Sequence, residues 1–147
     1  MKHIKGQSLF EVLIALAISA LIIGALVSLV SNSIRNTTFS KNQTIASRYA
    51  QETIEWLRTQ RDADISTFVT NVQTTVWCLP ELAFAQTGEC TGDEYIFETK
   101  LLREVFFTTS DISGKTMINA DVKITWEDAQ GVHEVSSSTN FTDWRQR

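Results

Sequence analysis

The chain opens with a hydrophobic segment that differs from everything after it. Between Glu11 and Arg35 there is no charged residue, and the side chains are almost all aliphatic or small. As an α-helix, a run of roughly 20 such residues is long enough to cross the hydrocarbon core of a bilayer. The pattern predicts a membrane-spanning helix at the N-terminus, followed by one small domain.

The residues beyond the apolar run continue the helix with a single apolar face. Ser31 to Asp62 contains neither proline nor glycine, and apolar side chains such as Ala46, Ala50 and Leu57 recur at steps of three or four residues. This spacing is typical of a helix with one buried side. We therefore predict one continuous helix from Ser8 to about Asp62, roughly 80 Å long at 1.5 Å per residue.

Residues 63–92 lose the helical period and contain the one proline, Pro80, together with Gly88 and Gly92. This composition predicts an irregular connection. Both cysteines of the chain, Cys78 and Cys90, lie in it. Because an even number of cysteines in an exported domain indicates disulfide bonding, we predict a Cys78–Cys90 disulfide that closes the connection. The apolar side chains of this connection either pack on the rest of the domain or form a binding surface.

Three segments with alternating apolar and polar residues follow, at Tyr95–Thr108, Ile118–Glu127 and Val132–Phe141. In the first of them Tyr95 and Phe97 fall on the apolar side. The second has the cleanest alternation, and the third is rich in Ser and Thr, which suits an edge strand. We predict an α+β fold in which the second half of the long helix packs on a three-stranded antiparallel sheet within residues 93–144.

The N-terminus combines three features. A basic leader with Lys2 and Lys5 ends at Gly6, ahead of the apolar run, whereas a secretory signal is cleaved after its apolar run. A single carboxylate, Glu11, lies just inside the run, where an ionised group is costly without a partner. This combination resembles the prepilin signal of type IV pilins and type II secretion pseudopilins. The sequence Leu-Phe-Glu-Val-Leu-Ile-Ala-Leu-Ala-Ile looks most like the minor branch of that family.

The resemblance implies a processing site and an assembly contact. A prepilin peptidase is expected to cut after Gly6 and to methylate the new amino group of Gln7, although most members have Phe where this chain has Gln7. Glu11 is expected to pair with the N-terminal amine of a neighbouring subunit. A buried charge is tolerated when a hydrogen-bonded counter-charge accompanies it. The implied partners are other pilin or pseudopilin subunits, the prepilin peptidase and an inner-membrane assembly platform.

The same resemblance divides the chain into three parts. Residues 1–6 are the cleaved leader, 7–34 the transmembrane or filament-core helix, and 35–147 the exported globular domain. The basic leader is expected on the cytoplasmic side of the inner membrane, which the chain crosses once. The C-terminal domain then lies outside the cytoplasm, and in the assembled state it belongs to a cell-surface or periplasmic filament.

The charge and the histidine content exclude several other classes of function. The net charge is −4, and loss of Lys2 and Lys5 makes it more negative, so bulk attraction to nucleic acid is disfavoured. Beyond the leader the only histidine is His133, on a predicted strand. A zinc site built from it and the two cysteines lacks a fourth ligand and the usual close cysteine spacing. We predict neither a catalytic site nor a metal or other cofactor, and therefore no enzyme.

Two functions from different classes remain. The first is a minor pilin or pseudopilin that assembles through its N-terminal helix, near the tip of the filament or in its initiation. The alternative is a membrane-anchored extracellular binding module that does not polymerise, in which the loop between Cys78 and Cys90 contacts a surface, DNA or secreted cargo.

Overall fold

The computed structural model describes residues 7–112 and 115–142; the side chains of residues 7, 8, 112 and 115 are not described. The chain divides into two compact units, Met1–Lys41 and Asn42–Arg147. Each unit is described by itself.

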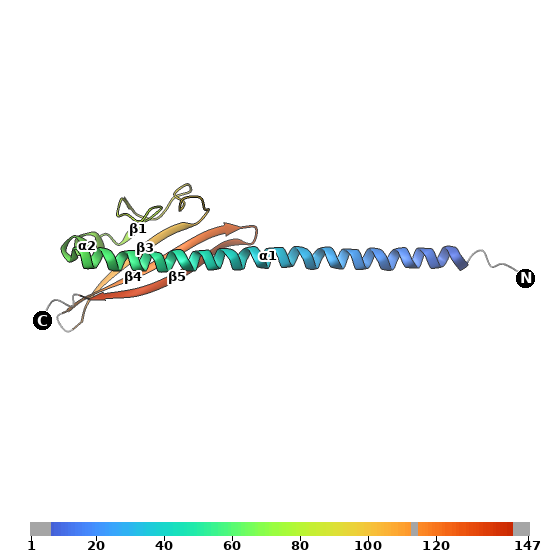
Figure 1. The fold of residues 1–147 in the computed structure, drawn as a ribbon, viewed down its shortest axis with the longest axis horizontal. Helices are drawn as coiled ribbons and strands as arrows, with labels where there is room; N and C mark the ends of the chain where they lie inside the picture. The colour runs from blue at the N-terminus through green and yellow to red at the C-terminus, as the bar shows by residue number, and fades with distance from the viewer. Residues whose placement is uncertain (1–6, 113–114, 143–147) are drawn as a thin grey trace, which may run out of the picture. The chain divides into compact units, whose positions relative to one another are not determined.

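The long helix α1 runs from Gln7 to Ala63 (Figure 1). It is the one helix in the described part of the chain that is long and apolar enough to cross a membrane. In the second unit, α1 buries Ala46, Ala50, Ile54 and Leu57, the face that the spacing predicts. The predicted α+β class, with a long N-terminal helix packed on an antiparallel sheet, is therefore confirmed.

The sheet has five strands rather than the predicted three. The three long strands are β3 (Leu102–Ile112), β4 (Lys115–Asp128) and β5 (Gly131–Thr142). Two short ones, β1 (Val76–Cys78) and β2 (Gln86–Thr87), extend the sheet in the order β2-β1-β3-β4-β5, with every pairing antiparallel. Strands of three and two residues are too short to show a period, which is why the sequence pattern misses them.

The connection predicted as irregular also contains a helix, α2, at Ile65–Val72. The Asp64 side chain caps it by accepting hydrogen bonds from the backbone N–H groups of Ser66 and Thr67. Phe68 and Val72 are buried, and the Phe68 ring packs edge-on against Phe141 with centroids 5.3 Å apart. An eight-residue helix spans barely two turns, so its apolar spacing is a weak signal.

The first long strand begins later than predicted. Residues 95–100 form a turn, in which the N–H of Ile96 donates to the Leu101 carbonyl (2.9 Å), and β3 starts only at Leu102. The expectation that Phe97 faces the core is wrong, because its side chain is 80% exposed. By contrast, β4 alternates as expected and buries Ile118, Ala120, Val122, Ile124 and Trp126.

Candidate assembly site

Glu11 lies at the start of α1, one helical turn after Gln7 and on the same side of the helix. Its side chain is exposed, as are the large apolar side chains around it, including Leu9, Phe10 and Ile14. Among the residues that the structure describes, no basic side chain pairs with it. The chain thus presents one carboxylate on an apolar helix and requires a partner for it from elsewhere.

Of the two residues of the predicted processing site, only the backbone of Gln7 is described. Gly6 lies outside the described residues, as do Lys2 and Lys5 of the leader. The backbone of Gln7 is helical. The structure therefore gives the setting of Glu11, while cleavage after Gly6 and methylation of Gln7 stay predictions.

The exposed apolar surface of α1 continues well beyond Glu11. Every large apolar side chain from Leu9 to Ile34 is exposed, all round the helix. A helix that is apolar on all sides is stable only when lipid or other apolar helices cover it. This segment can therefore serve both as a membrane span and as a packing surface between subunits.

The disulfide forms as predicted, between Cys78 and Cys90, with their Cα atoms 4.9 Å apart. Cys78 lies on β1 opposite Glu104 of β3, and the Glu104 carboxylate accepts a hydrogen bond from the Cys90 N–H (2.8 Å). The two sulfurs and the Glu94 carboxylate lie within 4.8 Å of one another. Because both sulfurs are bonded to each other, neither is a thiolate, the form in which cysteine binds metals. In the oxidised protein this cluster is therefore a covalent cross-link that stabilises the fold.

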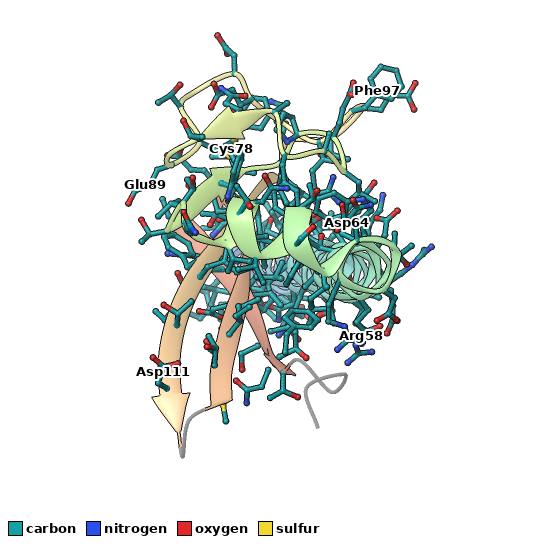
Figure 2. The ribbon with its side chains drawn as sticks, turned by 90° about the vertical axis from the view of Figure 1, so that its left-hand side faces the viewer. Arg58, Asp64, Cys78, Glu89, Phe97 and Asp111 are labelled. Atoms are coloured by element: carbon teal, nitrogen blue, oxygen red, sulfur yellow. A yellow bond between two sulfur atoms is a disulfide. The ribbon has the colours of Figure 1, made fainter. Side chains whose placement is uncertain are left out.

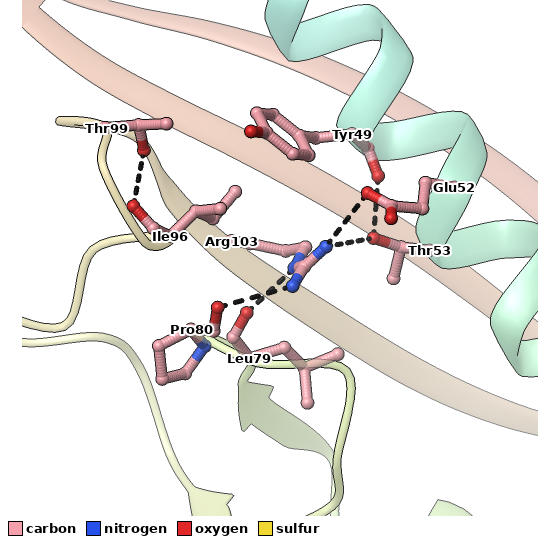
Figure 3. A network of polar contacts seen from close by, with 8 residues as sticks. All are labelled: Tyr49, Glu52, Thr53, Leu79, Pro80, Ile96, Thr99 and Arg103. Atoms are coloured by element: carbon pink, nitrogen blue, oxygen red, sulfur yellow. Dashed lines mark hydrogen bonds and ion pairs between the residues drawn. The ribbon is translucent and has the colours of Figure 1, made fainter.

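Arg103 holds the connection, the sheet and α1 together (Figure 3). Its side chain is 3% exposed; Nε donates to the Leu79 carbonyl (2.7 Å), and Nη2 donates to the Pro80 carbonyl (3.4 Å). On the other side, Nη1 lies 3.4 Å from Thr53 Oγ1 and 3.7 Å from Glu52 Oε2, both on α1. Burial lowers the pKa of Arg103, and the nearby Glu52 carboxylate opposes that shift.

Sequence reasoning missed Arg103, although a signal was present. Arg103 shares a face of the strand with Leu101 and Val105, so an alternating strand places it among core side chains. A charged residue at such a position needs partners. What the sequence does not reveal is that the partners are two carbonyls of the connection.

His133 lies on β5, opposite Trp126 of β4. Its Nε2 lies 2.9 Å from Asp128 Oδ1, and its ring packs near Trp126, with centroids 5.5 Å apart. The contact between His133 and Asp128 joins the third residue of β5 to the last residue of β4. This contact accounts for the histidine without a catalytic role.

Comparison with known proteins identifies the N-terminal segment. Residues 1–27 match the family model described as the prokaryotic N-terminal methylation motif. No curated protein and no solved structure matches the chain. The matched residues include Gly6, Gln7 and Glu11, and the apolar helix within them fits a single-pass anchor in the inner membrane.

Proposed function

We propose that this chain, whose residues 1–27 carry the prepilin signal of type IV pilins and pseudopilins, is a structural subunit of a type IV pilus or type II secretion-like filament. The observation that carries the proposal is the methylation motif on a helix whose apolar surface is exposed on all sides. Such a helix can pass from lipid to a bundle of identical helices without exposing its apolar side chains to water. A structural role of this kind requires no catalysis by the chain.

The first step of this function is processing. A prepilin peptidase removes Met1–Gly6 and methylates the amino group of Gln7, leaving 7–34 as the membrane or filament-core segment and 35–147 as the exported domain. Mass spectrometry of the native N-terminus tests it: the expected mature chain begins at N-methylated Gln7. A protein that keeps Met1–Gly6 in cells with an active prepilin peptidase contradicts the proposal.

The second step is assembly through Glu11. In a helical filament, the N-terminal amine on Gln7 of an adjacent subunit supplies the positive charge that Glu11 needs among apolar side chains. Glu11→Gln keeps the shape and removes the charge. Since loss of one member of a buried charge pair typically costs about 3–5 kcal/mol, the variant is expected to insert in the membrane, to be cleaved, and to enter filaments poorly.

The measurement compares sheared filaments with the membrane fraction at equal expression. Glu127→Gln is the control, because Glu127 is an exposed carboxylate on β4, outside the apolar run. Equal incorporation of the Glu11→Gln and wild-type chains would show that Glu11 is not an assembly contact.

Within the filament, we assign the chain a minor role near the tip or in initiation, which the resemblance of residues 9–18 to the minor branch supports. The second candidate function is a membrane-anchored binding module that does not polymerise. The observation that favours it is a recess of about 230 Å³ beside the loop between Cys78 and Cys90, whose lining includes Pro80, Glu81 and Gln86. A chain in which Glu11 is dispensable and the loop between Cys78 and Cys90 is essential would favour this second function.

A further inference from the structure

The loop that carries Phe97 is held rigidly with its aromatic side chain outward. Ile96 is buried, its N–H donates to the Leu101 carbonyl, and its own carbonyl accepts from the N–H of Thr99 (2.9 Å). Glu98 has a φ of 58°, in the left-handed region that residues with a Cβ rarely adopt. Figure 2 shows Phe97 pointing away from the strands and helices of its unit. Strain and an exposed aromatic ring at the same place are typical of a contact site.

The stretch that leads up to Lys100, the last residue of this loop, carries charges of one sign. Between Arg61 and Lys100 the chain contains no lysine or arginine, and its acidic residues are Asp62, Asp64, Glu81, Glu89, Asp93, Glu94 and Glu98. Glu98 is exposed beside Phe97, and in the described part of the chain no basic side chain forms an ion pair with it. A partner for this loop therefore needs an apolar recess with a positive charge next to it.

The outer side of α1 provides such a recess. A groove of about 630 Å³ is lined by Ile45, Arg48, Tyr49, Gln51, Glu52 and Glu55. Ile45 and Tyr49 are half-buried and pack against the core, so they form an apolar floor.

The charges that line this groove differ in whether the chain itself supplies their partner. Glu52 is paired with Arg103 and Glu55 with Arg58, whereas the exposed Arg48 forms no ion pair among the described residues. No acidic residue occurs between Glu11 and Glu52, so the part of the helix that leads up to Arg48 carries only positive charges, whereas the sequence that leads up to Glu98 carries only negative ones.

We propose that Phe97 of one copy docks in the α1 groove of a second copy, where Glu98 pairs with Arg48. Docking within one chain is excluded, because Phe97 is 80% exposed in its own chain. The contact joins two different surfaces, so the copy that gives its loop keeps its groove free and the copy that gives its groove keeps its loop free, and the contact can propagate along an array. The inference rests on the proposed function, because a filament holds many copies close together and strengthens each weak contact.

Cross-linking between two full-length chains with different tags tests the contact. One chain carries Lys100→Cys beside the loop and the other Gln51→Cys in the groove, and a short bis-maleimide is applied to membranes and to sheared filaments. Phe97→Ala, Glu98→Lys and Arg48→Glu are each expected to lower the yield of the mixed cross-link at least about fivefold. Combining Glu98→Lys with Arg48→Glu is expected to restore it to within about twofold, because the pair is re-formed with its signs exchanged.

Two matched controls show that the effect belongs to this contact. Val69→Ala removes an exposed apolar side chain from α2, and Lys123→Glu reverses a cation on β4 whose partner, Glu134, does not line the groove; neither should change the yield. Fluorescence of the buried Trp77 and Trp126 in the purified full-length chain, unchanged from the wild type, shows that each variant is folded.

The inference is overturned if Phe97→Ala, Glu98→Lys and Arg48→Glu leave the yield of the mixed cross-link unchanged. It is also overturned if the double variant gives a yield as low as that of the single variants. The proposed function is judged separately, by Glu11→Gln in the same filaments. If Glu11→Gln blocks incorporation while the loop and groove variants assemble and cross-link normally, the filament function stands and the contact is refuted. If Glu11→Gln has no effect, the cross-link yield in membranes still decides the contact.

Discussion

Replacing Arg103 by Met tests what holds the connection on the domain. Methionine has a similar length and fills the buried space, but it donates no hydrogen bond. The substitution leaves the Leu79 and Pro80 carbonyls without the donors at 2.7 and 3.4 Å, and removes the contact with Thr53 Oγ1 at 3.4 Å.

The size of the effect follows from the strengths of these contacts. The bond to Leu79 is short and its donor is charged, a class that contributes roughly 1.5–3 kcal/mol, while the two longer contacts add less. Removing the cost of burying a positive charge offsets part of the loss. We expect Arg103→Met to lower the free energy of unfolding by about 2–4 kcal/mol.

Glu52→Gln separates the hydrogen bonds from the ion pair. Glu52 lies 3.7 Å from Arg103 and its side chain is 52% exposed, so the pair is solvated and is expected to contribute less than about 1 kcal/mol. Arg103→Lys should recover little of the loss, because a single ammonium group cannot reach both carbonyls in the geometry of the guanidinium fork.

Urea unfolding of the full-length chain in detergent, followed by the fluorescence of the buried Trp77 and Trp126, measures these differences. Arg58→Met is the control, because Arg58 is 46% exposed and pairs with Glu55 only across one helical turn. If Arg103→Met is no less stable than this control, the hydrogen bonds to the connection do not stabilise the domain. If Glu52→Gln costs as much as Arg103→Met, the ion pair dominates and the reasoning is wrong.

Two further predictions concern the same connection. Replacing Cys78 and Cys90 together by Ser should lower the free energy of unfolding by about 2–4 kcal/mol, since the disulfide joins residues 12 apart. A reductant should move the urea midpoint of the wild type to that of the variant and leave the variant unchanged. A wild type whose midpoint does not move contradicts this. The second prediction concerns pH. Hydrogen bonds from Thr67, then from Ser66, hold the pKa of Asp64 well below its ordinary value of 3.8. Because the folded pKa is the lower one, the stabilisation of α2 is present above the ordinary value and is lost as the pH falls below it. Circular dichroism between about pH 5 and 2 should show a smaller loss of helical signal for Asp64→Asn than for the wild type. If the helical signals of the two proteins fall with pH in the same way, this role of Asp64 is ruled out.

Much of the fold was predictable because its signals are local. The unbroken apolar run and the spacing of Ala46, Ala50 and Leu57 define α1, and strict alternation defines β4. The relation between Gly6 and Glu11 likewise lies within a few residues, and the match to the methylation motif covers the same segment. A side chain's neighbours along a helix or strand follow from its period alone, so these features need no knowledge of distant parts of the chain.

The tertiary structure decided the features whose partners are far away in the sequence. Arg103 binds Leu79, 24 residues before it, and Thr53, 50 residues before it, and no local pattern contains those distances. β1 forms because β3 offers hydrogen-bonding groups beside it, and β2 forms because β1 does the same for it, although each is too short to show a period. Phe97 fits an inward position on an extended strand, yet the turn closed by Ile96 and Leu101 reverses the chain there and directs the ring outward. The sequence thus determined the long helix, the long strands and the N-terminal signal, whereas packing between distant residues determined the short elements, which side chains the domain buries and which it presents to a partner.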